Sequence, residues 1–192
     1  TDFTLPISTT IPVPAGATTA TLTIPLTDDT LVEPAETFTV QLTAADTITI
    51  PPAETVTITI TDNDLPTAVF ATTTYTVSES TPTLQLTVTL DQQAVTTGTI
   101  TYVTTSGTAT AGTDFITTAG LLTFLPGTTS QTVAIPILND NTQEPNESFT
   151  LTLLNPQNLT TAASPTITIV ILDNDTPPPS PTYTTYLPLI YQ

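Results

Sequence analysis

The 192-residue chain contains no lysine, arginine or histidine, so no side chain balances its 17 aspartates and glutamates, and its formal net charge is −17. Without basic side chains it cannot neutralise phosphates, which excludes electrostatic binding to nucleic acid or to an anionic lipid surface. The usual general bases and nucleophiles, histidine, cysteine and lysine, are all missing. Only carboxylate pairs remain for catalysis, so we do not expect an enzyme.

The absence of cysteine means that no disulfide stabilises the fold, and that thiols give no indication of the cellular compartment. Long apolar runs are missing too. None approaches the roughly 18 residues that a transmembrane helix needs, so the sequence predicts no membrane span. Helical periodicity is not found either, and the abundance of threonine favours strands.

What the sequence does contain is an internal repeat. Residues 139–149 (NDNTQEPNESF) resemble residues 28–38 (DDTLVEPAETF), which lie 111 residues earlier, with acids, a proline and a phenylalanine at matched positions. Continued without a gap, the same spacing aligns residues 173–175 with residues 62–64, and both read Asp-Asn-Asp. The chain therefore carries two copies of one unit.

The repeat accounts for most of the acids. A one-residue shift aligns Asp2 with Asp114, and 14 of the 17 acids then fall in the two copies. The first copy holds Asp2, Asp28, Asp29, Glu33, Glu36, Asp62 and Asp64, and the second holds Glu79, Asp114, Asp140, Glu144, Glu147, Asp173 and Asp175. Two carboxylates about 5 Å apart repel by roughly 3 kcal/mol at an effective dielectric constant near 20. Since no base offsets this repulsion, a calcium ion, which takes six to eight oxygen ligands, is the best fit. A solvated acidic loop without an ion is the alternative.

Apolar residues recur at every second position in both copies, which is typical of half-buried strands. In the second copy this pattern predicts strands near residues 69–78, 84–90, 98–104, 120–125, 131–138, 148–154 and 166–172. In the first copy it predicts strands near residues 22–26, 38–42 and 56–60. Seven strands separated by polar turns indicate an all-β, antiparallel, immunoglobulin-like sandwich. The clearest inward face is formed by Leu84, Leu86, Val88 and Leu90.

The organisation that follows is a tandem of sandwiches. Residues 68–175 form a complete domain, residues 65–67 a linker, and residues 1–64 an incomplete copy that lacks the first three strands. Pro25 and Pro136 interrupt matching strands, which predicts an edge or bulged strand in both copies. An incomplete sandwich exposes apolar surface and open edges, so the first copy needs completion. Either another subunit supplies the strands, or they lie upstream in a longer array.

These motifs resemble a known family. Residues 107–115 (GTATAGTDF) are similar to the G-T-A-x-x-G-x-D-Y motif of Calx-β domains, which occur in sodium/calcium exchangers and large bacterial surface proteins. Residues 122–127 (LTFLPG) resemble its L-x-F-x-x-G turn, and residues 144–149 its E-x-x-E-x-F motif. The resemblance covers nearly all of residues 68–175 and the later part of a copy in residues 1–64.

The resemblance implies calcium as the cofactor, together with a set of ligands. Carried over by position, the ligands of the second copy are Glu79, Asp114, Asp140, Glu144, Glu147, Asp173 and Asp175. The seven acids of the first copy are candidate ligands in the same way. Asn139 and Asn174 stand where exchanger domains often have aspartate, which implies fewer ions or weaker binding. With Asn63 they complete the candidate ligand set.

Two N-x-[ST] sequons are candidate glycosylation sites. Asn146 lies between two proposed ligands, where a glycan would crowd the ion, so Asn158 is the better acceptor. Residues 176–192 comprise a proline-rich stretch, which predicts a stiff spacer, and an apolar tail. The tail is either a sorting or anchoring signal or a strand that docks on another subunit. Its candidate polymerisation residues are Tyr186, Leu187, Leu189, Ile190 and Tyr191.

We expect a secreted structural or adhesive protein of the cell surface. Its calcium-stiffened repeats would join head to tail, by strand addition, into a filament or surface layer. A calcium-sensing regulatory module of a larger protein is an alternative, and it would require an attached effector. A carbohydrate-binding or cell-surface-binding module is a further alternative. It would require a row of exposed aromatic residues, which Tyr75 and Tyr102 alone do not form.

Overall fold

The computed structural model describes residues 2–5, 10–43 and 55–177, and within these ranges it is all β. The first copy contributes two strands, β1 (Glu36–Gln41) and β2 (Thr55–Ile60). The strands of the second copy are, in chain order, β3 (Thr67–Phe70), β4 (Thr74–Ser78), β5 (Thr83–Leu90), β6 (Gly98–Ser106), β7 (Ala119–Phe124), β8 (Ser130–Pro136), β9 (Glu147–Gln157), β10 (Thr160–Thr161) and β11 (Thr166–Leu172).

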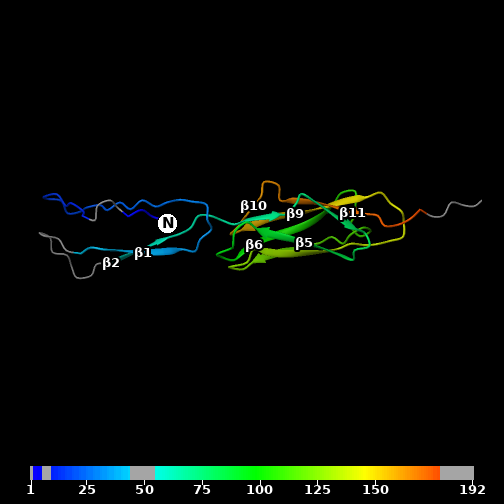
Figure 1. Cartoon of the computed structure of the whole chain (residues 1–192), viewed down its shortest axis with the longest axis horizontal. Helices are drawn as coiled ribbons and strands as arrows, with labels where there is room; N and C mark the ends of the chain where they lie inside the picture. Colours follow the sequence, from blue (N-terminus) through cyan, green and yellow to red (C-terminus); the bar gives the residue numbers. More distant parts are fainter. Residues whose placement is uncertain (1, 6–9, 44–54, 178–192) are drawn as a thin grey trace, which may run out of the picture.

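The second copy is a sandwich of two sheets (Figure 1). One sheet has the strand order β10-β3-β5-β8, and the other has the order β4-β11-β9-β6-β7. Most neighbours are antiparallel, but β4 lies parallel to β11 and β10 lies parallel to β3. This architecture confirms the predicted all-β, immunoglobulin-like sandwich.

The core lies between the two sheets, because inward apolar residues alternate with outward polar residues along each strand. All four inward residues of β5 are buried, as predicted: Leu84, Leu86, Val88 and Leu90. Phe115 and Phe149 are fully buried, and their rings stack with centroids 4.0 Å apart. The two phenylalanines follow the acidic residues 114 and 147 closely in sequence.

The single strand predicted at residues 69–78 is wrong, because the chain changes sheets within it. β3 pairs with β5, whereas β4 pairs with β11 in the opposite sheet. Alternation along the sequence shows which side chains face the core, but it does not show which strand supplies the hydrogen bonds. With this split and the short β10, the second copy has more than the seven predicted strands.

The strand predicted at residues 22–26 is also wrong. Only an isolated bridge between Leu26 and Phe3 forms there. Its counterpart in the second copy is β8, which pairs only with β5 and is therefore an edge strand, as Pro136 predicted. The first copy has no counterpart of β5 within the described ranges, so the segment has no neighbour on which to form a ladder.

The first copy nevertheless repeats part of the packing of the second. Phe3 and Phe38 stack with ring centroids 4.3 Å apart, as Phe115 and Phe149 do. No described residue of residues 2–64 is buried, however. β1 and β2 pair only with each other, so both outer edges of this two-stranded sheet are open in the described part of the chain.

The two copies lie in line, with the β1–β2 sheet at one end (Figure 1). Between them, the linker is held by the second sandwich: Thr67 donates its N–H to Asp91 Oδ1 at 2.7 Å, and the Pro66 carbonyl accepts the Thr160 N–H at 2.9 Å. In the described ranges, no helix has the length and apolar character to cross a membrane. The apolar tail, including Tyr186, Leu187, Leu189, Ile190 and Tyr191, lies outside the described residues.

The difference in burial predicts unequal effects of matched core substitutions. Phe149→Ala should destabilise the second sandwich by about 3–5 kcal/mol, because it opens a cavity in a closed core. Phe38→Ala, at the matched but half-buried position, should leave that unfolding transition almost unchanged. Urea unfolding of both variants measures this difference, and equal losses would contradict the account of the core.

Candidate metal centre

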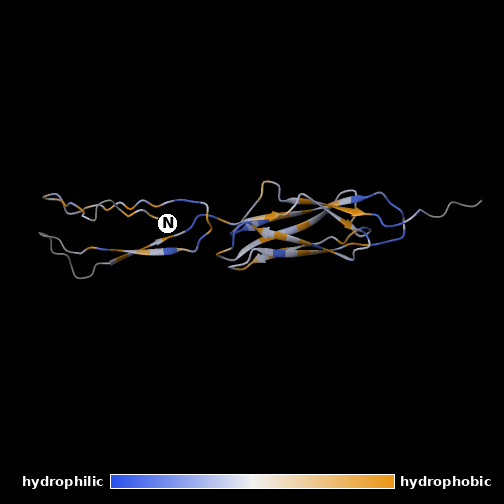
Figure 2. Cartoon of the chain, viewed as in Figure 1, coloured by the Kyte–Doolittle hydropathy of each residue, from blue (hydrophilic) through white to orange (hydrophobic). Residues whose placement is uncertain are grey.

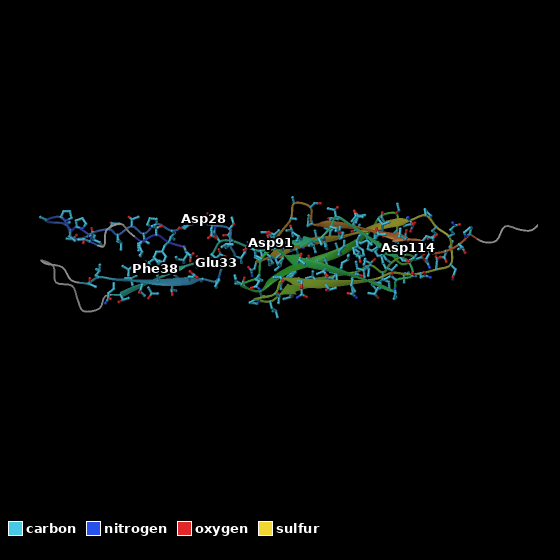
Figure 3. The ribbon with its side chains drawn as sticks, in the orientation of Figure 1. Asp28, Glu33, Phe38, Asp91 and Asp114 are labelled. Atoms are coloured by element: carbon cyan, nitrogen blue, oxygen red, sulfur yellow. The ribbon has the colours of Figure 1, made fainter. Side chains whose placement is uncertain are left out.

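The acids of the second copy gather at one end of the sandwich, where strands begin and end. Glu79 directly follows β4 and Asp173 directly follows β11, and these two strands are parallel, so their carboxyl ends share one edge. β9 runs antiparallel to β11, which places Glu147, its first residue, at the same end. Asp114 lies there too, at the opposite end from Asp91 (Figure 3). The loop that precedes β9 is hydrophilic (Figure 2).

Glu79, Asp140 and Asp175 form a first carboxylate cluster, with one oxygen of each within 4.8 Å of the others. Glu79 is only 8% exposed, and its Oε1 accepts the Asp140 N–H at 2.8 Å. Asp140 Oδ1 in turn accepts the Thr142 N–H at 2.6 Å. Asp175 Oδ2 is buried and has no hydrogen-bond partner. An unpaired buried carboxylate oxygen is costly, and a bound cation would satisfy it, so the site fits a metal ion.

Asp114, Glu144 and Glu147 form a second cluster of the same tightness. Asp173 connects the two clusters, because its Oδ2 accepts the Glu144 N–H at 3.2 Å and its Oδ1 accepts the Asp175 N–H at 3.1 Å. All seven predicted ligands of the second copy are thus brought together. The division of the carboxylates into two clusters is consistent with two neighbouring cation positions.

Crowding of the carboxylates changes their acidity. Burial, a hydrogen bond to Asp114 and the surrounding negative charges raise the pKa of Glu147 from 4.5 to about 7. Burial, followed by the charges of Asp140 and Asp114, also raises the pKa of Glu144. These carboxyl groups therefore resist ionisation in the calcium-free fold, and a cation would restore the charged form.

The first copy assembles its acids in the same way. One cavity of about 50 Å³ is lined by all eight of its candidate ligands: Asp2, Asp28, Asp29, Glu33, Glu36, Asp62, Asn63 and Asp64. The hydrogen bond from Glu36 lowers the pKa of Asp2 and raises the pKa of Glu36. Burial, followed by the charge of Asp62, raises the pKa of Asp64.

Three hydrogen bonds from the backbone to carboxylates recur at matched positions in both copies. Asp29 Oδ1 accepts the Leu31 N–H at 2.8 Å, and the matching bond in the second copy joins Asp140 to Thr142. Asp62 accepts the N–H groups of Glu33 and Asp64 at 2.9 and 3.2 Å. Asp173 makes the two equivalent bonds in the second copy. The repeat seen in the sequence is therefore a repeat of loop geometry.

The first site differs in being less compact. Glu79 of the second copy follows β4, and the described part of residues 2–64 contains no counterpart of that strand. Among the described residues, no three carboxylates of the first site approach one another as closely as in the two clusters of the second.

The candidate asparagines take different positions. Asn139 is exposed and donates its Nδ2–H to the Asp140 carbonyl at 3.0 Å, and Asn174 is exposed beside Asp173. Asn146 is exposed in the loop before β9. Asn158 is also exposed, but its Nδ2–H donates to the Thr97 carbonyl at 3.0 Å, so the predicted glycan acceptor already has a structural role.

Sequence reasoning missed a polar residue at the first site. Gln92, in the loop after β5, binds the backbone of Thr30 and Val32 through its side-chain amide. No motif or periodicity marks this residue, because its partners lie about 60 positions away in the other copy.

Fold and site together define a class of protein, that of tandem immunoglobulin-like modules with carboxylate-rich strand ends. The chain belongs to the Calx-beta domain family, which matches it twice, over residues 2–64 and 61–176.

The sodium/calcium exchanger Calx of Drosophila melanogaster is 38% identical over 91 residues, which are 47% of this chain and 10% of the exchanger. The chain thus matches only about a tenth of that relative. Among solved structures, the apo form of the Calx CBD1 domain is 34% identical with a TM-score of 0.56, covering 58% of this chain and 100% of that one. The calcium binding domain CBD12 of CALX1.1 is 35% identical with a TM-score of 0.54, covering 56% of this chain and 46% of that one.

The raised pKa of Glu147 predicts an unusual dependence of stability on pH. Because its folded-state pKa lies above its ordinary value, Glu147 favours the calcium-free fold when protonated, and this contribution is lost as the pH rises through about 7. The melting temperature of the calcium-free protein should therefore rise as the pH is lowered from about 8 to about 5. Glu147→Gln should make this slope shallower and Asp91→Asn should not, whereas an unchanged slope in Glu147→Gln would refute the assignment.

Proposed function

We propose that the chain is a calcium-binding module that acts by binding and changing its rigidity, not by catalysis, and that it serves as a calcium-sensing part of a larger protein. Membership of the Calx-beta family and similarity to a sodium/calcium exchanger support this function. A solved relative is named as a calcium binding domain, which supports calcium as the ion.

The observation that carries the proposal is the pair of clusters in the second copy, the first of which contains the buried, unpaired oxygen of Asp175. A solvated acidic loop would let its carboxylates spread apart. Here the backbone N–H groups of Thr142, Glu144 and Asp175 fix the carboxylates of Asp140 and Asp173, in an arrangement that the first copy repeats.

The proposal assigns two ions to the second copy. One ion would be held by Glu79, Asp140 and Asp175, and a second by Asp114, Glu144 and Glu147. Asp173 orients the loop between them through its two backbone bonds. When bound, calcium supplies the positive charge that the chain lacks. The looser first site, without a counterpart of Glu79, would bind its ion more weakly.

Calcium should stabilise the fold. At a free concentration 100-fold above the dissociation constant, binding to the folded state alone adds about 2.7 kcal/mol per site, so chelation should lower the melting temperature clearly. Asp140→Ala and Asp173→Ala should each remove most of the shift that belongs to the second sandwich.

Asp91→Asn is the control for this experiment. It removes a charge outside both sites, yet it keeps the Oδ1 acceptor that binds the Thr67 N–H, which Asp91→Ala would lose. Identical melting curves in chelator and in millimolar calcium would reject the metal assignment.

Self-association of an extracellular protein is a second candidate function, and the incomplete first copy favours it. β1 and β2 have open outer edges in the described part of the chain, and Leu26 and Val56 are 61% and 58% exposed. A strand of another subunit would satisfy the edges by main-chain hydrogen bonds, and a head-to-tail contact of this kind extends into a filament. We propose the apolar tail as the donor.

Removal of residues 183–192 tests this second function. The shortened protein should remain a monomer at concentrations where the whole chain associates, because the donated strand is gone. Sedimentation velocity and electron microscopy of both proteins provide the measurement. Association that persists unchanged in the shortened protein would eliminate the tail as donor.

Glycosylation is a further proposal. Glycosylation at Asn158 or Asn146 is compatible with their exposure. A carbohydrate-binding surface is not proposed, because Tyr102 packs against the core, so that Tyr75 and Tyr102 do not form a row of exposed aromatic residues.

A further inference from the structure

Gln92 joins the two copies through its side chain. Its Oε1 accepts the Val32 N–H at 3.0 Å, and its Nε2–H donates to the Thr30 carbonyl at 2.8 Å. Both partners belong to the loop that carries Asp29 and Glu33, two candidate ligands of the first site. The reverse placement of oxygen and nitrogen would face like groups toward each other, so the partners define the orientation of the amide.

The backbone around Gln92 is anchored on the second sandwich. Before it, Asp91 makes hydrogen bonds to both the N–H and the carbonyl of Thr67. After it, Ala94 is 2% exposed, and its carbonyl accepts the Gly127 N–H at 2.8 Å. The backbone of Gln92 is therefore fixed to the second sandwich. For this reason its two side-chain bonds restrain the position of the first copy.

The bond between Gln92 and Val32 is an addition to a set of loop hydrogen bonds that is otherwise the same in both copies. In the first copy the consecutive N–H groups of Leu31, Val32 and Glu33 are accepted by Asp29, Gln92 and Asp62. In the second copy the N–H groups of Thr142 and Glu144 have matching carboxylate partners. Within the described residues, Gln143, which corresponds to Val32, has no such third partner. The extra bond is thus specific to the junction.

The amide is also chemically suited to this position. A carboxylate would add charge beside a loop that already carries Asp29 and Glu33, and it could not donate to the Thr30 carbonyl. A neutral amide donates and accepts at once, and its bonds do not depend on the presence of an ion. Loss of one such hydrogen bond typically corresponds to a two- to tenfold change in a local equilibrium.

We propose that Gln92 is a positioning residue that fastens the loop of residues 30–32 to the second sandwich, fixes the orientation of the two copies without an ion, and preorganises the first site. The part that concerns ion affinity rests on the calcium-binding function proposed above. The effect on the orientation of the copies does not rest on it, so the two parts of the proposal can be disproved separately.

The test uses the whole chain and a matched pair of variants, Gln92→Met and Gln93→Met. Methionine keeps the length of the side chain but removes the donor and the acceptor, and Gln93 is the exposed neighbour. In calcium-free protein, Gln92→Met should speed hydrogen exchange of the Val32 N–H about two- to tenfold and should broaden the distribution of relative orientations seen by residual dipolar couplings. Gln93→Met should change neither, and unaltered exchange and orientation in Gln92→Met would overturn the proposal.

A calcium titration of the same variants tests the second part. The affinity of the first site should fall about two- to tenfold in Gln92→Met, while the sites of the second sandwich and its melting temperature stay as in the unmodified chain. An equal loss at both sites, or none at the first, would overturn the preorganising role. If calcium binds nowhere, the calcium-binding function fails, and the exchange and orientation measurements still decide whether Gln92 fastens the loop.

Discussion

Repulsion among carboxylates that no basic side chain can offset is the constraint on which this structure depends. The chain carries 17 acids and gathers most of them in one group in each copy, where the hydrogen bonds that hold them come from backbone N–H groups. Asp62 and Asp173 each hold two such donors, and this explains why both loops take the same course. The bonds orient the carboxylates but leave their charge in place. The proposed cations would neutralise this charge.

The strands of the sandwich fix the two ends of each acidic loop in the second copy. Parallel pairing of β4 with β11 and antiparallel pairing of β9 with β11 bring three strand ends to one edge. Phe115 and Phe149, whose rings stack, follow Asp114 and Glu147 closely in sequence. In the first copy the matching rings stack and three matching bonds form, yet none of its described residues is buried. The geometry of the acidic loop therefore does not require a complete core, since the first copy has it. The close grouping of three carboxylates is found only in the complete second sandwich among the described residues.

Much of this was predictable from the sequence, and the failures have physical causes. Recurrence at a fixed spacing located both sets of acids, because a repeated loop must repeat its ligands and its phenylalanine anchor. Alternation identified the inward face of β5. It could not show that the chain changes sheets between β3 and β4, since both segments keep the same period while exchanging partners. Nor could it find Gln92, because a single amide acting across the junction leaves no pattern along the chain.

The path of the chain through the second sandwich has a mechanical consequence. The chain enters at β3 beside the first copy and leaves after β11 at the opposite end (Figure 1). Tension applied along this line pulls β4 and β11 past each other, and their parallel ladder of five register pairs is loaded in shear. In shear, the hydrogen bonds must yield together, whereas a hairpin pulled open from one end gives way bond by bond. The parallel pairing of β4 and β11, which brings the acids to one end of the sandwich, thus also lets the domain resist tension along the chain.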